Sequence, residues 1–461
     1  MAEANDRKPR RLYVGVDVGG TKILAALARG SGKIVVRQRR PTPRGCPPAE
    51  TVAAIAEAID DVLAGTGPKR ASAEAIGLAI PGVVDSEAGR IIVTPNMNLS
   101  GVAICGELSE RFGVPVVLGN DVNLGTLAES WMGSASAAAS AVGVFVGTGI
   151  GGGIVLAGRL VTGWRGAAAE IGHMQMAPDG PLCGCGGRGC LEALASRTAI
   201  ERDIRQAVAD GASTVLTELL DGDLSIIKSS MLRRALERED ELVTRTMARA
   251  AETLGRACLN IRHLLDPEVI VLGGGVVEAC EFFLMPIVQR VVAADPLGGP
   301  APGGRIAVAS LGDDAVVLGA VAVARAAVRG PAPMGSRRAA WDYPVISAVR
   351  PGEAVVGEKV CRGDFFVRAD GKVKSRRKVL AKLGPGSTGL IGPEELAKVC
   401  KGGAGRLIIG AGHQSQAQLT EEGERFLQGR GIDFEVLSTP AAVEAYNAAG
   451  GRKAALILVD R

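Results

Sequence analysis

Four residues with metal-binding side chains lie within one short, glycine-rich stretch of the chain. His173, Cys183, Cys185 and Cys190 fall inside EIGHMQMAPDGPLCGCGGRGCLE, which spans residues 170–192. Three thiols and one imidazole at this density are the ligand set of a tetrahedral zinc site. Because four protein ligands leave no position for water or substrate, we expect a structural ion that fixes a loop bracketed by acidic residues. The alternative interpretation is a group of ordinary buried cysteines.

Two glycine-rich turns, each placed between two apolar segments, have the composition of phosphate-binding loops. The first is VGGTK at 18–22, and the second is GTGIGGG at 147–153, about 130 residues later. The backbone amides of such a strand–turn–strand unit can line a phosphate, and Asp17, just before the first turn, can hold Mg²⁺ through water. One copy alone is a weak signal. Two copies predict a duplicated α/β fold whose halves clamp a nucleotide.

Polar residues follow the ends of two further apolar segments. In the apolar segment at 75–84 we expect a strand that ends at Pro81-Gly82, in the position where open α/β sheets bind ligands. Asp121 follows the strand expected at 114–118 and precedes an expected helix, which suits a general base. Asp121 can equally be the cap of that helix, and the local sequence does not distinguish the two roles. Asn96 suits sugar hydroxyls or simply stabilises a turn.

Composition excludes several classes of protein. The 461 residues carry a formal net charge of +4, too mild for nucleic-acid binding, and 47% of them are hydrophobic, enough for large cores. No apolar stretch approaches the ~18 residues of a membrane span, and we recognise no signal peptide. The cysteines outside the zinc stretch are scattered without a disulfide framework. A cytoplasmic protein that contacts neither membrane nor nucleic acid is therefore expected.

A Pro- and Gly-rich segment divides the chain near residue 330. We expect an N-terminal lobe at 1–118, completed by a helix at 315–328, and a second lobe at 119–314 that holds the zinc loop. A linker at 329–340 and a small α/β domain at 341–461 follow.

The motifs of the first part resemble those of the ROK family of sugar kinases and repressors. They are VGVDVGGTK at 14–22, PGVVD at 81–85, NDVN at 120–123, EIGH at 170–173 and CGCGGRGCLE at 183–192. The resemblance implies the duplicated actin-like ATPase and sugar-kinase fold, of the ribonuclease H type, in two lobes. It also implies a kinase that uses a hexose and ATP with Mg²⁺, and it makes Asp121 the general base. Glucokinase is the leading expectation, and we expect a homo-oligomer.

The resemblance assigns the remaining roles residue by residue. Glu170 and Glu192, as planar acceptors, suit a polyol, and His173 can serve metal and substrate through its two ring nitrogens. The expected sugar-binding residues are Gly82, Asn96, Asn120, Glu170, His173 and Glu192. The expected nucleotide-binding residues are Asp17, Gly19, Gly20, Thr21, Lys22, Thr148, Gly149, Gly274 and Gly275.

Several alternatives stay open. The acceptor can be another hexose or an N-acetylhexosamine, the donor ATP or polyphosphate, and the protein can be a sugar sensor or scaffold without activity. Because only eleven residues precede Leu12, we expect an enzyme rather than a repressor with a DNA-binding domain. The segment at 341–461 resembles a small α/β family that includes a mitochondrial complex I assembly factor, and this resemblance implies no chemistry.

Overall fold

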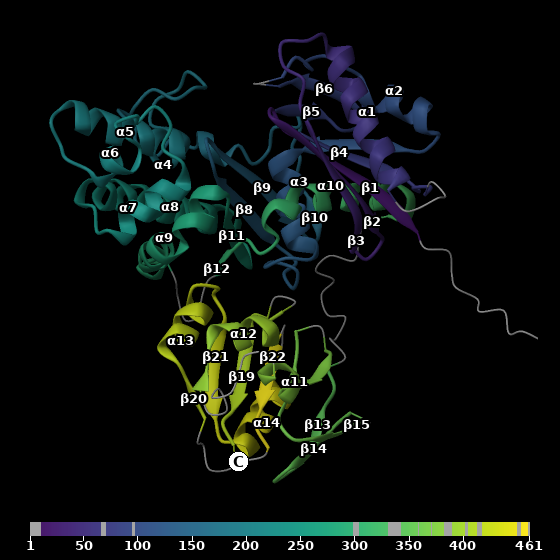
Figure 1. Ribbon diagram of the computed structural model, residues 1–461, viewed down its shortest axis with the longest axis vertical. Coiled ribbons are helices and arrows are strands. Elements are labelled where there is room, and N and C mark those ends of the chain that lie inside the picture. Colours follow the sequence, from purple (N-terminus) through teal and green to yellow (C-terminus); the bar gives the residue numbers. More distant parts are fainter. Residues whose placement is uncertain are drawn as a thin grey trace, which may run out of the picture.

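The chain forms two α/β lobes followed by a smaller C-terminal α/β domain (Figure 1). The computed structural model describes residues 11–65, 71–94, 97–297, 304–330, 343–357, 359–369, 371–381, 390–401, 404–412, 417–449 and 453–459. Each lobe has its own large hydrophobic core, and the C-terminal domain has two smaller ones on the two faces of its main sheet. Within the described residues, no helix has the length and apolar character that a membrane crossing requires.

The N-terminal lobe is built on a five-stranded mixed sheet. Antiparallel β1 and β2 form the first hairpin, and β4 and β7 continue the sheet in parallel with β1. Every residue of β4 is buried, because helices cover both faces of the sheet at its centre. In sheet order the strands are β3 (Ile34–Pro41), β2 (Lys22–Arg29), β1 (Leu12–Val18), β4 (Ile76–Ile80) and β7 (Val116–Asn120). Helices α1 (Pro48–Ala64) and α2 (Ile104–Phe112) complete this lobe.

The C-terminal lobe repeats the same sheet, which confirms the predicted duplication. Antiparallel β8 and β9 form the second hairpin, and β11 and β12 are parallel to β8. Strand β11, like β4, is buried throughout. In sheet order the strands are β10 (Arg159–Leu160), β9 (Ile150–Leu156), β8 (Ala141–Val146), β11 (Val269–Gly273) and β12 (Arg305–Val308). The helices of this lobe are α4 (Leu191–Ala195), α5 (Arg197–Ala209), α6 (Val215–Leu219), α7 (Ser229–Glu237), α8 (Glu241–Leu265) and α9 (Gly275–Ala293).

Two helices, α3 (Asp121–Trp131) and α10 (Ala315–Arg329), pack against each other between the sheets (Figure 1). Helix α10 also lies on β1 and β4 of the N-terminal sheet. The approach is close enough to require glycine, because a Cβ on Gly319 would lie 1.9 Å from the Leu124 carbonyl oxygen. A Cβ on Gly77 would meet the Ala320 carbonyl oxygen at the same distance.

The buried Glu129 joins the two chain segments that enter and leave this helix pair. Its side chain is fully buried in α3 and accepts hydrogen bonds from the backbone N–H groups of Ser310 and Leu311, each at 2.8 Å. The backbone N–H of Ser134 donates to the other carboxylate oxygen, also at 2.8 Å.

The lobe boundary expected after residue 118 falls inside strand β7. The lobe boundaries stay a prediction.

Local sequence sets the ends of β4 and α8. Strand β4 of the segment 75–84 ends just before Pro81-Gly82, as expected, because proline lacks an N–H and Gly82 has a φ of 102°. A separate hairpin of β5 (Val83–Asp85) and β6 (Arg90–Val93) follows. Helix α8 begins at Glu241, where Asp240 accepts a hydrogen bond from Val243 N at 2.8 Å and caps the helix.

The C-terminal domain has its own mixed sheet, with three parallel strands on one side and two antiparallel strands on the other. Its strands, in sheet order, are β17 (Val373–Ser375), β16 (Phe365–Val367), β22 (Lys453–Ile457), β19 (Arg406–Gly410) and β21 (Asp433–Leu437). The smaller elements are β13 (Ile346–Arg350), β14 (Glu353–Val356), β15 (Lys359–Arg362), β18 (Leu390–Ile391), β20 (Gln418–Leu419), α11 (Arg377–Leu380), α12 (Pro393–Val399), α13 (Glu421–Gln428) and α14 (Thr439–Ala448). The end of α13 contacts the C-terminal lobe, where Gln289 Nε2 of α9 donates to Gln428 O at 3.2 Å. Most of the expected linker, residues 331–340, lies outside the described residues.

Candidate functional site

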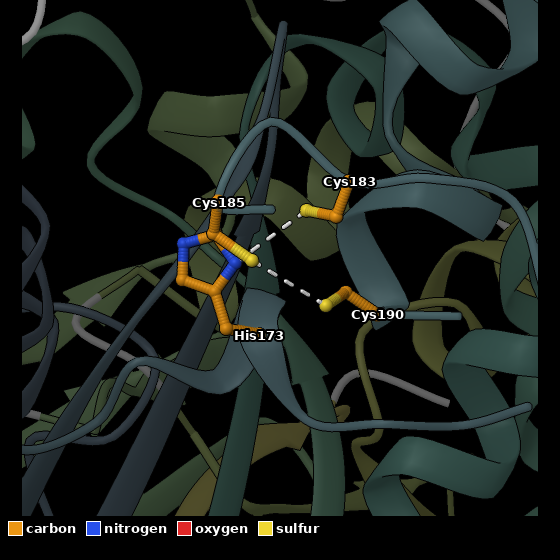
Figure 2. A group of neighbouring side chains, drawn as sticks. All are labelled: His173, Cys183, Cys185 and Cys190. Atoms are coloured by element: carbon orange, nitrogen blue, oxygen red, sulfur yellow. Dashed lines mark hydrogen bonds between the residues drawn. The ribbon is translucent and has the colours of Figure 1, made fainter. Parts of the chain in front are cut away.

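The four predicted metal ligands converge on one point (Figure 2). His173 ends the 3₁₀ helix η1 (Ile171–His173), and Cys190 immediately precedes α4. All four ligand atoms lie within 4.8 Å of one another. Cys185 Sγ lies 3.7 Å from Cys190 Sγ, and Cys183 Sγ lies 3.7 Å from His173 Nδ1. Two thiolates at ~2.3 Å from a tetrahedral zinc ion are separated by about 3.8 Å, so the donor set fits a possible metal site.

Tight backbone turns bring the cysteines together. Cys183 N donates to Gly187 O at 2.8 Å, and Gly186 N donates back to Cys183 O at 3.0 Å. Gly189 has a φ of 66°, and a Cβ there would lie 1.5 Å from the Ala177 carbonyl oxygen. Glycine is therefore necessary at position 189 for the loop to fold on itself.

The thiols of this loop differ in pKa. Burial raises the pKa of Cys190 to about 12, whereas the Gly187 N–H lowers the pKa of Cys185. A cation bound as a thiolate complex must displace protons from these groups, so its affinity depends on pH.

Asp121 occupies the first turn of α3, but it is not the helix cap. The cap is Asn120, whose Oδ1 accepts from Asn123 N at 3.0 Å. The Nδ2 group of Asn120 donates to Gly82 O at 3.0 Å, which joins two predicted site residues. Asp121 Oδ1 accepts a hydrogen bond from the adjacent Val122 N, at 2.9 Å. The capping role that the sequence left open for Asp121 thus belongs to its neighbour.

The carboxylates of Asp17 and Asp121 are both buried, and their charges interact. Burial raises the pKa of Asp121, and the nearby charge of Glu170 adds to that rise. Burial also raises the pKa of Asp17 to about 6, with the Asp121 charge as the next cause. Lys22, at the start of β2, opposes the rise at Asp17. Both aspartates are therefore desolvated, and each lies within electrostatic range of a neighbouring charge.

The segment at 170–192 that carries the four metal ligands, called the metal loop below, connects the expected sugar site to the second phosphate loop. His173 Nε2, on the ring edge away from Cys183, lies 4.0 Å from Glu170 Oε2. Glu192 Oε1 lies 3.8 Å from Cys183 Sγ, and Glu192 Oε2 accepts from Ile150 N at 2.8 Å. A continuous series of neighbours thus runs from Asp121 through the metal loop to the β8–β9 turn.

The phosphate-loop candidates lie at the tips of the two hairpins. In the first, Gly19 N donates to Lys22 O at 2.9 Å, which closes the turn and leaves Thr21 exposed. In the second, a Cβ on Gly149 would lie 2.3 Å from Glu192 Oε2, so only glycine admits that carboxylate. Gly20 and Thr148 lie in the same two turns.

Gly274 and Gly275 lie beside the second hairpin, where β11 passes into α9. A Cβ on Gly274, which has a φ of 86°, would lie 2.6 Å from Val146 O. The pair thus contacts the strand that leads into the Thr148 turn. Asn96 lies outside the described residues.

Sequence reasoning missed two arginines and one groove. Arg44 and Arg197 each donate a hydrogen bond to the threonine of a phosphate loop. A single arginine forms no sequence motif that would reveal its role, although Arg197 follows the segment at 170–192 closely. A groove of about 510 Å³ extends from Asn120 to the exposed Trp164 and is lined by both lobes. Its residues are far apart in the chain, so only folding reveals it.

Comparison with known proteins separates the two parts of the chain. Residues 13–327 match the model of the ROK family, and residues 346–459 match that of a protein family of unknown function, DUF498/DUF598. The chain is 36% identical to a glucokinase of Halalkalibacterium halodurans over 67% of this chain and 93% of that one. It is 35% identical to a glucokinase of Thermotoga maritima over 70% of this chain and all of that one. An N-acetylmannosamine kinase of Yersinia pseudotuberculosis is 32% identical over 61% of this chain and 87% of its own length.

Solved structures agree with this division. A ROK family glucokinase from Streptomyces griseus, in complex with glucose and AMPPNP, matches at 30% identity and a TM-score of 0.59, over 68% of this chain and 99% of that one. A ROK hexokinase from Thermus thermophilus matches at 35% identity and a TM-score of 0.57, over 69% of this chain and 99% of that one. With this fold and these matches, the chain belongs to the ROK family, and it carries a separate C-terminal domain of the DUF498/DUF598 family.

Proposed function

We propose that this protein transfers the γ-phosphoryl group of ATP to a hexose, with glucose as the preferred acceptor and its 6-hydroxyl as the nucleophile. Membership of the ROK family supports the coarser statement, a hexose kinase. The observation that carries the proposal is the position of Asp121. It is a desolvated carboxylate whose pKa is raised further by the charge of Glu170 of the metal loop, and its own charge raises the pKa of Asp17, just before the first phosphate loop.

Asp121 acts as the general base. The sugar hydroxyl oxygen bonds to the γ-phosphorus as the bond from that phosphorus to the bridging oxygen breaks, and ADP leaves. The hydroxyl proton passes to the Asp121 carboxylate and then to solvent. Because burial raises the pKa of Asp121, it accepts this proton more readily than an exposed aspartate would. Asn120 holds the helix start in place and leaves the carboxylate of Asp121 available for the sugar.

Residues of the metal loop hold the acceptor sugar. Glu170 and His173 offer a carboxylate and an imidazole edge 4.0 Å apart, a spacing that suits adjacent sugar hydroxyls. Glu192 is fixed by Ile150 N, so its position depends on the phosphate loop as well as on the metal loop. A zinc ion bound by the four ligands would stiffen this loop and take no part in the chemistry.

The two hairpin turns and Asp17 serve the phosphates. Phosphoryl transfer depends on in-line positioning and on neutralisation of charge. Mg²⁺ bound with ATP supplies part of that neutralisation, and Asp17, at the end of β1, is the residue that would hold it through water. Closure of the lobes around the helix pair α3 and α10 would exclude water from the reacting groups.

A bulkier acceptor such as an N-acetylhexosamine is the second candidate. The groove that begins at Asn120 and extends to Trp164 adjoins the proposed sugar site, and an N-acetyl substituent could occupy it. Glucose remains the first choice because the metal-loop and base motifs are those of the glucokinase-like members, as the similarity to the glucokinases of Halalkalibacterium halodurans and Thermotoga maritima also indicates.

A coupled ADP-release assay over a panel of sugars tests the proposal. The panel contains glucose, fructose, allose, N-acetylmannosamine and N-acetylglucosamine, with ATP and polyphosphate as donors. We expect the highest kcat/KM with glucose and ATP. Asp121→Asn should lower kcat by about 100- to 10,000-fold with little change in glucose affinity. Glu110→Gln, at an exposed site in α2, is the matched control.

The outcomes separate the alternatives. A preference for an N-acetylhexosamine replaces glucose by the second candidate. Measurable sugar binding without turnover of any sugar would favour a sensor and would reject the kinase proposal. Near-normal turnover by Asp121→Asn would reject the assignment of the base.

A further inference from the structure

Each phosphate loop has a guanidinium hydrogen-bonded to its threonine hydroxyl. In the N-terminal lobe, Arg44 Nη2 donates to Thr21 Oγ1 at 3.0 Å, and Arg44 Nε lies 3.4 Å from Gly20 O. In the C-terminal lobe, Arg197 Nη2 donates to Thr148 Oγ1 at 2.8 Å. The two hairpins lie on opposite sides of α3 and α10 (Figure 1). Each side of the cleft therefore places one arginine beside its own phosphate loop.

Duplication of the fold does not explain this arrangement. Arg44 follows Thr21 by 23 residues and lies in the segment after β3. Arg197 follows Thr148 by 49 residues and is the first residue of α5. The two arginines come from unrelated elements, so the feature they share is the loop that they contact. Both arginines are explained if each phosphate loop requires a positive charge beside it.

Arg197 is the more firmly held of the two. Its Nε lies 3.1 Å from Oε1 of the buried Glu201, one helical turn away, and its backbone N donates to Gly147 O at 2.9 Å. Its side chain is only 27% exposed, whereas Arg44 is exposed. A guanidinium fixed in this way loses little conformational freedom when it binds a ligand.

We propose that Arg44 and Arg197 are phosphate ligands that exchange the threonine hydroxyls for the β- and γ-phosphate oxygens of bound MgATP. A hydroxyl is a neutral acceptor, and a phosphate oxygen is anionic. The exchange therefore replaces an ordinary hydrogen bond by a charge-assisted one, and the planar fork of arginine suits two phosphate oxygens.

The proposal rests on the proposed kinase activity and adds two residues to it. During transfer, negative charge builds up on the oxygen that leaves with ADP and is spread over the γ-phosphoryl oxygens. A guanidinium on each side of the triphosphate stabilises this charge. Because Arg197 is held by Glu201, it contributes more to turnover, and the exposed Arg44 contributes more to nucleotide affinity.

The test replaces each arginine in the full-length protein by methionine, which keeps most of the length and removes the charge, and by lysine. Arg256→Met is the matched control, because Arg256 is a 67% exposed arginine of α8 whose ion-pair distance to Glu252 is 3.9 Å. Thermal unfolding of each variant verifies that it folds. The measurements are kcat and KM for MgATP with the best sugar, and calorimetric affinities for MgATP and for AMP, which lacks the β- and γ-phosphates.

We expect Arg197→Met to lower kcat/KM for MgATP by about 10- to 100-fold, the range for loss of a charge-assisted hydrogen bond. Arg44→Met should mainly weaken MgATP binding. In both variants AMP affinity and the KM for sugar should stay within about 2-fold of the wild type, and lysine should restore part of the loss.

Other outcomes overturn the assignment. It is wrong if both methionine variants match Arg256→Met in kcat/KM, or if AMP affinity falls as much as MgATP affinity. Failure of the wild type to phosphorylate any sugar is a separate result. It would reject the proposed function, and the comparison of MgATP with AMP would still decide whether the arginines bind phosphate.

Discussion

Replacement of Asp17 by asparagine should make the folded protein more stable while it removes activity. Asp17 lies at the end of β1, and burial together with the charge of Asp121 raises its pKa to about 6. In an unfolded chain the pKa of aspartate is about 3.9. The folded state therefore resists ionisation of this carboxyl, and asparagine, which has nearly the same shape, removes the charge.

The size and pH dependence of the effect follow from the two pKa values. Because the pKa of Asp17 is higher in the folded protein than in the unfolded chain, ionisation of this carboxyl lowers the free energy of unfolding. The loss is small below pH ~4 and reaches its full size well above pH 6. A difference of about 2 units corresponds to about 3 kcal/mol at pH 8, with about half of it at pH 5. Because Asp17 is partly open to solvent in the cleft, we expect a stabilisation of about 1–3 kcal/mol at pH 8.

The assay measures the free energy of unfolding of the full-length wild type and of Asp17→Asn between pH 5 and pH 8. Nucleotide and Mg²⁺ are left out, because Mg²⁺ would bind the carboxylate. Glu110→Gln, at an exposed carboxylate of α2, should change stability by less than about 0.5 kcal/mol at any of these pH values. The reasoning is refuted if Asp17→Asn is no more stable than the wild type at pH 8, or if its advantage does not shrink toward pH 5. Turnover with MgATP should fall in the same variant.

Three further predictions concern the base, the metal loop and the helix pair. The acid limb of the kcat/KM profile for the sugar should lie above the pH range of an exposed aspartate, because burial raises the pKa of Asp121; a limb near pH 4 would contradict this. Cys185→Ser should lose a zinc ion, counted by atomic absorption, and most activity, and full activity in zinc-free wild type would exclude a structural ion. Glu129→Gln should destabilise the fold by about 2–4 kcal/mol in urea unfolding, because an NH₂ group would face the N–H donors of Ser310 and Leu311 or of Ser134. A change as small as that of Glu110→Gln would show that these contacts matter little.

The sequence by itself determined the features that depend on local spacing. The metal ligands are close in the chain, and their glycines allow few other conformations, so His173 and the three cysteines could be predicted to meet. The repeated hairpin was visible because each copy is a continuous apolar–glycine–apolar segment, and the two sheets confirm it. The linker and the C-terminal domain followed from a break in composition and from the resemblance of the last segment.

Only the tertiary structure decided how distant segments meet. Local sequence left Asp121 open as a base or as the cap of the following helix, and the structure gives the cap to Asn120, whose side chain also contacts Gly82. The arginines beside the phosphate loops and the burial of Glu129 were likewise not predictable. Their partners lie 23 to 182 residues away, and which pairs touch is set by packing of the sheets and helices rather than by any local pattern.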